Sequence, residues 1–267
     1  MQMRCLWVLI FFLCACNETE VDESSVAKVD AITIDTVDLE LEARVRAMMG
    51  VGLPKLNNKN STEFLTKWGD EHDERFVTME TKYGEIVVEL FHDTPIHRAN
   101  FIYKIFRKYY SPSEFIRVVP DFVVQGGNSE EERPQEMRFL IGLYSLESEF
   151  KDHHVHHRGA LAMSRSYTNN PNKRSSSYDF YIVTGSDQSK GGLARIEKEH
   201  GFVYTEKQKS MYYNSGGVPH LDGEHTVFGQ VIRGMDVVDS LAATPTDDSD
   251  WPIVKLEVKM AAHSELP

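Results

Sequence analysis

One arginine interrupts an apolar, β-prone run over Phe115–Gly127, which reads FIRVVPDFVVQGG. Alternation along an extended chain puts Phe115, Arg117 and Val119 on the same strand face. Arg117 is therefore expected where a purely structural strand would carry an aliphatic side chain. A guanidinium among hydrophobic side chains costs free energy unless it is paired or used in chemistry. Arg117 is a candidate functional residue; the alternative is a structural arginine whose charged end reaches water.

The first sixteen residues form a distinct segment, with a short basic start, an apolar run and a small residue before a cysteine. The run is shorter than the roughly 20 residues that cross a bilayer, and it is typical of a cleavable secretory signal over residues 1–15. Leu13-Cys14-Ala15-Cys16 resembles the lipobox of bacterial lipoproteins. We therefore expect a lipid anchor on Cys16. An ordinary signal peptide that contains cysteines is the alternative.

Cysteine content and net charge exclude several classes of site and partner. All three cysteines, Cys5, Cys14 and Cys16, lie in this first segment. A chain that begins at Cys16 can form no internal disulfide and no cysteine-based metal site or nucleophile. The formal net charge of −12 argues against nucleic acid as a partner, since phosphate binding needs a basic face.

The next sixty residues separate this segment from a regular domain. Residues 16–35 are acidic and poor in aromatic side chains, which predicts a disordered tether that holds a folded domain away from a membrane. Residues 36–75 are expected to form a helical N-terminal extension, with helices near 38–49 and 61–68. The sequence assigns this extension no function.

From residue 76 onward the pattern is rich in short strands. Residues 76–81 and 85–91 alternate around Lys82-Tyr83-Gly84, which predicts a β-hairpin. Asp93-Thr94-Pro95 supplies a helix start. Helices are expected at 95–109 and 235–242, and further strands near 114–119, 121–126, 159–165, 179–184, 226–232 and 253–260. Residues 129–149 and 186–217 resemble insertions, the second with a short helix at 205–213. Such a pattern suits an antiparallel barrel capped by helices.

Phe115–Gly127 and the later run Leu221–Gly229, LDGEHTVFG, together resemble the cyclophilin-type peptidyl-prolyl cis–trans isomerases. The resemblance covers residues 76–262. It implies a mainly β fold, a closed eight-stranded antiparallel cyclophilin-like barrel capped by two α-helices. It also implies isomerase activity on X-Pro bonds and no cofactor.

The resemblance assigns roles to particular residues. Arg117 matches the catalytic arginine, and Gln125 matches the glutamine that helps to hold arginine and substrate. The expected pocket for the proline ring consists of Phe122, Val123, Tyr181, Leu221 and His225. Ser164 and Arg165 occupy the positions that bind the peptide backbone.

Three of the expected substrate-binding positions depart from the family pattern. Asp179 stands where the family usually has glutamine, which predicts a carboxylate that pairs with Arg117 or with Arg165. Arg165 itself replaces a usual asparagine. His220 stands where cyclosporin-sensitive members have tryptophan, so we expect weak inhibition by cyclosporin.

Prolyl isomerisation needs neither a proton transfer nor a nucleophile. Amide resonance opposes rotation by about 18–20 kcal/mol, so a catalyst must bind the twisted amide better than either planar isomer. An apolar slot for the proline ring and a fixed cation supply this preference. We therefore expect His225 to be a wall of the pocket rather than an acid or a base.

The run His153-His-Val-His-His157 can be interpreted as part of a metal site, because alternation puts His154 and His156 on one face. No residue nearby supplies a third ligand at a typical spacing. We expect a solvated loop before the strand at 159–165, and no metal site.

These observations predict a secreted, lipid-anchored monomer in the cell envelope that isomerises X-Pro bonds in extracytoplasmic polypeptides and so assists their folding. One alternative is a proline-peptide binding or chaperone module with little turnover, which the changes at Asp179 and Arg165 favour. Another is a structural lipoprotein whose pocket is vestigial.

Overall fold

The computed structural model describes residues 50–129 and 131–267. The chain divides into two compact units, residues 1–39 and 40–267, and all described residues belong to the second. The signal segment 1–15, Cys16, the tether 16–35 and the helix expected at 38–49 lie outside the described residues. Within the described part of the chain, no helix is both long and apolar enough to cross a membrane.

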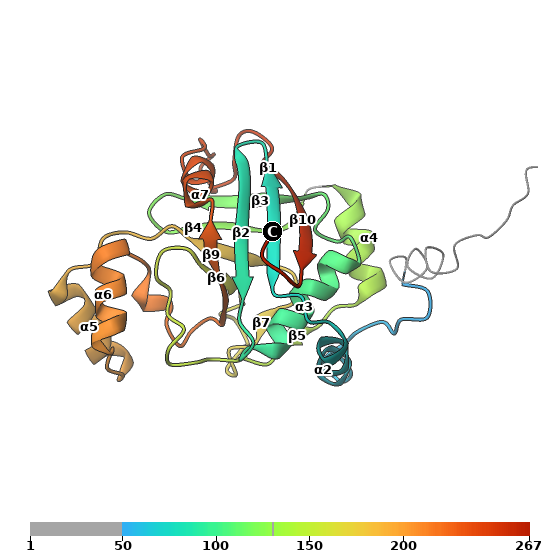
Figure 1. Ribbon diagram of the computed structural model, residues 1–267, viewed down its shortest axis with the longest axis horizontal. Helices are drawn as coiled ribbons and strands as arrows, with labels where there is room; N and C mark the ends of the chain where they lie inside the picture. Colours follow the sequence, from blue (N-terminus) through green and yellow to red (C-terminus); the bar gives the residue numbers. More distant parts are fainter. Residues whose placement is uncertain (1–49, 130) are drawn as a thin grey trace, which may run out of the picture. The chain divides into compact units, whose positions relative to one another are not determined.

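A closed barrel of eight strands forms the centre of this unit (Figure 1). Its strands are β1 (Phe76–Thr81), β2 (Gly84–Leu90), β3 (Ser113–Val119), β4 (Val123–Asn128), β6 (Ala160–Met163), β8 (Phe180–Val183), β9 (Val227–Arg233) and β10 (Glu257–His263). They follow one another round the barrel in the order β1-β10-β3-β4-β8-β6-β9-β2, and every pair is antiparallel. The predicted fold class is confirmed. Two short strands, β5 (Ser145–Leu146) and β7 (Ser175–Ser176), pair outside the barrel.

The last strand begins later than predicted, at Glu257 instead of residue 253. The chain before it turns back on itself: Asp247 N–H donates to the Trp251 carbonyl at 2.8 Å, and the Asp247 carboxylate accepts from Trp251 N–H at 3.0 Å. Ile253, at the predicted start of the strand, donates its N–H to the Pro245 carbonyl at 3.0 Å, so this donor is used within the turn and not in the barrel.

Two of the helices expected from the sequence contact strands of the barrel. Helix α3 (Pro95–Phe106) contacts β10, and α7 (Met235–Ala242) contacts β2, β3 and β4. Three others lie in the predicted insertions: α4 (Glu132–Ile141), α5 (Lys190–His200) and α6 (Glu206–Ser215). Helix α6 was predicted. Helix α5 was not predicted. Its Gly191-Gly192 pair disfavours a helix, but the Ser189 hydroxyl caps the helix by accepting from Gly192 N–H at 3.0 Å.

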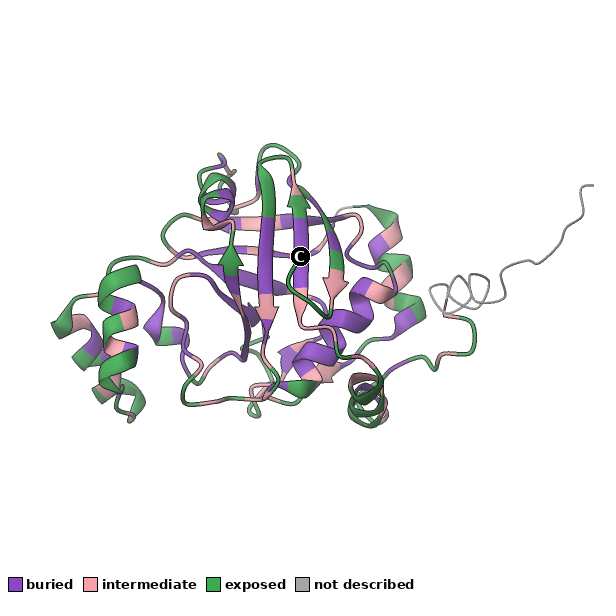
Figure 2. Cartoon of the chain, in the orientation of Figure 1, coloured by how far each residue is buried: buried purple, intermediate pink, exposed green. Residues whose placement is uncertain are grey.

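Helix α2 (Ser61–Glu71) belongs to the same hydrophobic core as the barrel. It packs against α3, with the rings of Phe64 and Trp68 edge-on to Tyr103 at centroid distances of 5.1 and 5.0 Å. The buried Arg98 guanidinium on α3 donates to carbonyls at the end of α2, including Gly69 at 3.2 Å, which satisfies acceptors that a helix end leaves free. Figure 2 shows the long buried stretches of β1, β2 and α3.

A β-bulge in β3 reverses the expected direction of Arg117. The register runs from Phe115 opposite Gly126 to Arg117 opposite Gln125, with a shift between them. Phe115 and Val118 both lie in the barrel core, so Arg117 faces the other way, outward. The prediction that Phe115 and Arg117 share a face is wrong, because the bulge inserts one residue and strict alternation fails there.

Candidate active site

A second apolar cluster lies on the outer face of the barrel wall. It consists of Val123, Ala160, Ala162, Tyr181, Val183, Val218, Leu221 and Val227, with Phe91 and Phe122 packed against it. These residues alternate with core residues along β4, β8, β6 and β9. The 3₁₀ helix η2 (Pro219–Leu221) adds Leu221 from outside the sheet. The structure thus brings the predicted pocket residues Phe122, Val123, Tyr181 and Leu221 into one apolar patch.

Arg117 lies at the edge of this patch and pairs with a carboxylate that the sequence did not indicate. Its Nη2 lies 3.1 Å and its Nε 3.2 Å from Oδ2 of Asp250. The guanidinium carbon is 5.9 Å from the centroid of the Phe122 ring. The side chain is 40% exposed, so the cation is open to a ligand. Gln125 stands directly opposite Arg117 in the register.

Asp179 pairs with neither arginine proposed from the sequence. Its Oδ1 accepts from Arg138 Nη2 at 2.9 Å, and its Oδ2 accepts from the Ser176 hydroxyl at 2.8 Å. Arg138 also donates to the Gly127 carbonyl at 3.0 Å. The predicted pairing of Asp179 with Arg117 or Arg165 is therefore wrong. Arg138 lies on α4, a helix that the sequence did not predict.

Arg165 points towards Glu224. Its Nε donates to the Glu224 carbonyl at 2.6 Å, its Nη2 forms an ion pair with the Glu224 carboxylate, and its guanidinium carbon lies 4.0 Å over the Tyr167 ring. The neighbouring Ser164 uses its N–H to donate to the Asp179 carbonyl at 2.8 Å. These bonds fix the backbone at positions 164 and 165, and its role in gripping a peptide remains a prediction.

The buried His225 is held as a neutral ring. Nδ1–H donates to the Met163 carbonyl at 3.1 Å, and Nε2 accepts from the Tyr167 hydroxyl at 2.8 Å. Burial lowers the pKa of His225 to about 4, because the charged form loses its hydration. The ring lies edge-on to Tyr181 at 5.5 Å. This geometry fits a pocket wall.

His220 lies on the exposed side of the patch. Its ring stacks on that of Phe122, with centroids 5.8 Å apart and planes inclined by 9°. An imidazole thus covers one face of the phenylalanine at this position. Its effect on cyclosporin binding stays a prediction.

A buried network that the sequence did not reveal supports Tyr181 from behind. The Tyr181 hydroxyl lies 3.0 Å from His156 Nε2, and His156 Nδ1–H donates to Asp222 Oδ1 at 2.7 Å. Asp222 Oδ2 accepts from the hydroxyls of Tyr204 and Tyr212 at 2.7 and 2.5 Å. His156 is fully buried, so the expectation of a solvated histidine loop is wrong at this residue. Tyr212 lies on α6, so the α5–α6 insertion supports the wall of the pocket.

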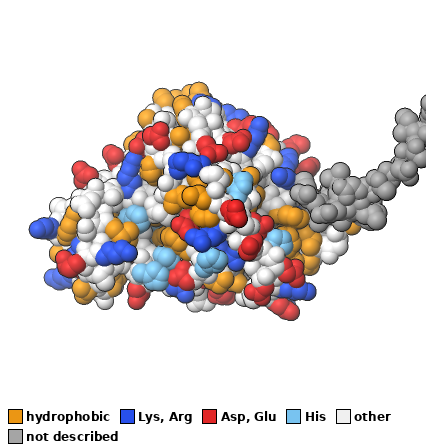
Figure 3. Space-filling view, viewed as in Figure 1, with side chains coloured by type: hydrophobic (Ala, Val, Ile, Leu, Met, Phe, Trp, Pro, Cys, Tyr) orange, Lys and Arg blue, Asp and Glu red, His pale blue; other side chains and the backbone are white. Residues whose placement is uncertain are grey.

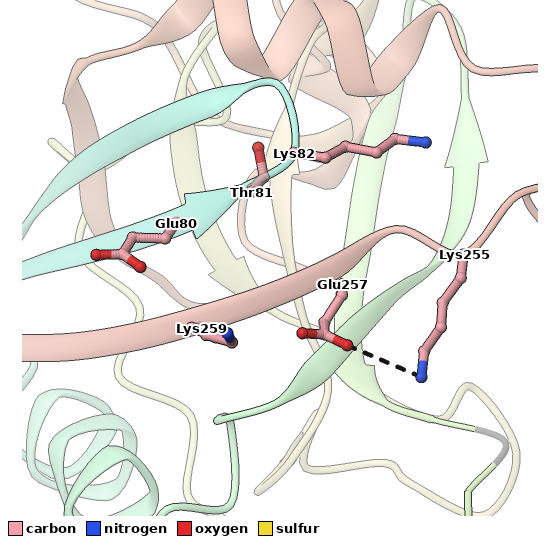
Figure 4. Close-up of a pocket in the computed structure, with 6 residues that line it drawn as sticks. All are labelled: Glu80, Thr81, Lys82, Lys255, Glu257 and Lys259. Atoms are coloured by element: carbon pink, nitrogen blue, oxygen red, sulfur yellow. Dashed lines mark ion pairs between the residues drawn. The ribbon is translucent and has the colours of Figure 1, made fainter.

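A separate shallow hollow lies between β1 and β10 (Figure 4). Its volume is about 280 Å³, and it is lined by Glu80, Thr81, Lys82, Lys255, Glu257 and Lys259. Lys255 Nζ lies 4.0 Å from Glu257 Oε2. The lining carries both signs of charge and includes none of the predicted site residues, so we assign it no role in the site.

Comparison with known proteins identifies the family that this chain matches. Residues 76–263 match the family model described as cyclophilin type peptidyl-prolyl cis-trans isomerase/CLD. A Streptococcus pyogenes protein named as a bifunctional phosphatase/peptidyl-prolyl cis-trans isomerase is 32% identical over 246 residues, 80% of this chain, and the chain spans 50% of its length. A peptidyl-prolyl cis-trans isomerase of Acinetobacter baylyi is 29% identical over 64% of this chain and 73% of its own.

Among solved structures, a Cryptosporidium parvum cyclophilin type peptidyl-prolyl cis-trans isomerase is similar with a TM-score of 0.50 and 22% identity. The similarity covers 72% of this chain and 99% of the other. At this identity the comparison bears on the fold alone, and it agrees with the closed barrel.

The depressed pKa of His225 predicts a loss of stability in acid. The folded ring titrates at about 4 and the unfolded ring near 6.5, so the unfolded chain binds more protons between these values. His225 therefore leaves the free energy of unfolding at its full value above pH 6.5 and lowers it as the pH falls towards 4. Urea unfolding measures the free energy of unfolding at pH 7 and at pH 4.5. The decrease between these two pH values should be smaller in His225→Gln than in the parent chain, by roughly 2–3 kcal/mol. The exposed His200 provides the control His200→Gln; equal losses in all three proteins would contradict the assignment.

Proposed function

Because the chain belongs to the cyclophilin-type peptidyl-prolyl cis–trans isomerase family, we propose that it isomerises X-Pro bonds of extracytoplasmic polypeptides with Arg117 as its catalytic group. The observation that carries this proposal is the position of Arg117, a partly exposed cation beside the apolar patch that includes Val123, Tyr181 and Leu221. The proline ring binds the patch. The guanidinium then acts on the amide next to it.

The mechanism is non-covalent. Twisting the X-Pro bond breaks amide resonance and leaves a lone pair on the proline nitrogen, which a fixed donor stabilises and which neither planar isomer presents. Arg117 is that donor, and Gln125, opposite it on β4, orients the arginine and the peptide. A cation held in place before the reaction loses little energy to reorganisation. Neutral His225 adds apolar surface and transfers no proton.

A second candidate function, proline-peptide binding with little turnover, is favoured by the ion pair between Arg117 and Asp250. A carboxylate that neutralises the guanidinium weakens its hold on a developing lone pair. The pair is exposed at both ends, with 40% and 42% of the side chains accessible. Exposed pairs contribute only about 0.2–1 kcal/mol, so a substrate can displace Asp250, and turnover remains the better-supported function.

The N-terminal sequence supports a place of action in the cell envelope. A signal over residues 1–15 and a lipidated Cys16 would anchor the chain in the cell envelope, and the acidic stretch 16–35 would space the barrel from the membrane. The substrates in that compartment are exported polypeptides whose folding waits on slow X-Pro isomerisation.

Replacing Arg117 should abolish most of the catalysis. In Arg117→Ala we expect kcat/KM for cis-to-trans relaxation of a short X-Pro peptide to fall by about 10²–10³-fold, the usual loss for a preorganised electrostatic group. Arg233→Ala removes another exposed arginine, which pairs with Glu85 at 2.9 Å, and serves as the control. Peptide binding without turnover in the unmodified chain would favour the second candidate.

Removing the competing carboxylate should have the opposite effect. Asp250→Asn should raise kcat/KM by up to about fivefold, which corresponds to the free energy of an exposed ion pair. Asp250 has a positive φ of 63°, a conformation that asparagine also tolerates, so the loop should keep its shape. Asp236→Asn, an exposed carboxylate on α7, is the matched control. A lower rate in Asp250→Asn would show that the pair positions Arg117 instead of competing for it.

The anchor is tested separately. Cys16→Ser should release the chain from the membrane fraction into the soluble fraction on cell fractionation, because lipidation needs the thiol. Cys14→Ser tests whether the change is specific to position 16. Membrane retention of Cys16→Ser would count against the lipid anchor and leave the isomerase proposal untouched.

A further inference from the structure

We propose that Asp93, His153 and His154 form a binding site for one divalent transition-metal ion of the zinc class. The three residues come from two separate stretches of chain. Asp93 follows β2, and the two histidines lie in the segment between β5 and β6. No third ligand could be assigned to these histidines from the sequence, because Asp93 is about sixty positions away.

The geometry brings both rings to one carboxylate. His153 Nε2 lies 2.8 Å from Asp93 Oδ2, and His154 Nε2 lies 2.8 Å from Asp93 Oδ1. A candidate ligand atom from each of the three residues lies within 4.8 Å of those of the other two. Zinc bonds of about 2.0–2.2 Å place tetrahedral ligand atoms roughly 3.4 Å apart. A small opening of the cluster would therefore admit an ion, which would replace the protons now shared between the rings and the carboxylate.

Part of the site is already rigid and part is open. The His154 ring stacks on Phe91, with centroids 3.9 Å apart and planes inclined by 11°, and only 13% of its side chain is exposed. His153 is 68% exposed and Asp93 40%, so both can adjust their rotamers and leave a coordination position for water. One held ligand reduces the conformational entropy that binding must overcome.

The donor types favour one class of ion. Imidazole suits zinc, copper, nickel and iron, whereas calcium and magnesium take oxygen ligands in larger number. Two imidazoles, a carboxylate and an open position match the ligand set of zinc sites with three protein ligands and a bound water. We therefore assign the site to a divalent transition-metal ion of the zinc class and use zinc as the probe.

The proposed site lies beside a cavity that is larger than the hollow between β1 and β10. His153 and His154 also line a cavity of about 770 Å³, whose apolar walls include Phe91, Phe202 and Met211. Figure 3 shows histidine side chains gathered on this face, between the end that carries α5 and α6 and strand β2. A zinc-bound water here would stand at the edge of a cavity whose lining includes neither Arg117 nor Phe122. The proposal therefore does not depend on the proposed isomerase activity.

Calorimetric titration of the tag-free full chain with zinc chloride tests the site. Cys5, Cys14 and Cys16 are replaced by serine in every sample, because thiolates bind zinc. We expect one ion per chain. His153→Ala, His154→Ala and Asp93→Asn should each weaken binding at least tenfold, whereas the exposed histidine variant His200→Ala should bind as the parent does. Thermal melting without metal verifies that each variant folds.

Two further readouts decide between a built site and surface binding. Cobalt(II) in place of zinc should give an absorption spectrum of four-coordinate nitrogen and oxygen ligation, lost in His154→Ala. Excess magnesium should leave zinc bound. The proposal is overturned by the absence of zinc binding, by equal binding in all folded variants, or by displacement with magnesium.

Discussion

The candidate active site depends on one irregularity in a strand. The bulge between Phe115 and Arg117 lets β3 supply an aromatic ring to the barrel core and, two residues later, a guanidinium to the outer wall. Without it, Arg117 would point into a closed interior, where an unpaired cation is very costly. Because of the bulge, the same strand can contribute an apolar side chain to the core and a charged side chain to the surface. It also sets Arg117 opposite Gln125 and beside Phe122.

The outer wall is built with support from segments that surround the barrel. Asp222 accepts hydrogen bonds from His156, Tyr204 and Tyr212, and His156 in turn contacts the Tyr181 hydroxyl. A buried carboxylate with all these donors is well compensated for its lost hydration. Residues that resemble an insertion in the sequence therefore help to hold Tyr181, a side chain of the predicted proline pocket, in place.

The sequence predicted which apolar residues lie together, but not the partners of the charged residues Arg117 and Asp179. Phe122, Val123, Tyr181 and Leu221 could be assigned because each lies in a short motif whose neighbours match the family. The partner of Arg117 could not, because Asp250 lies 133 positions away in a loop without a local signal. The partner of Asp179 was missed for a related reason. Arg138 lies on α4, where the large apolar residues Phe139 and Leu140 are exposed, so no helical face was apparent. Ion pairs depend on tertiary proximity, which periodicity does not encode.

Because α2 packs on α3, the hydrophobic core begins earlier in the chain than the match to the family model does. The family match begins at residue 76, but the hydrophobic core already includes Leu56 and Leu65. A chain cut at residue 76 would expose the side of Tyr103 that Trp68 now covers, together with the Arg98 guanidinium that bonds the end of α2. The smallest piece of this chain that folds as it does here therefore starts before Leu56. The stretch that matches the family model is therefore shorter than the stretch that shares one hydrophobic core.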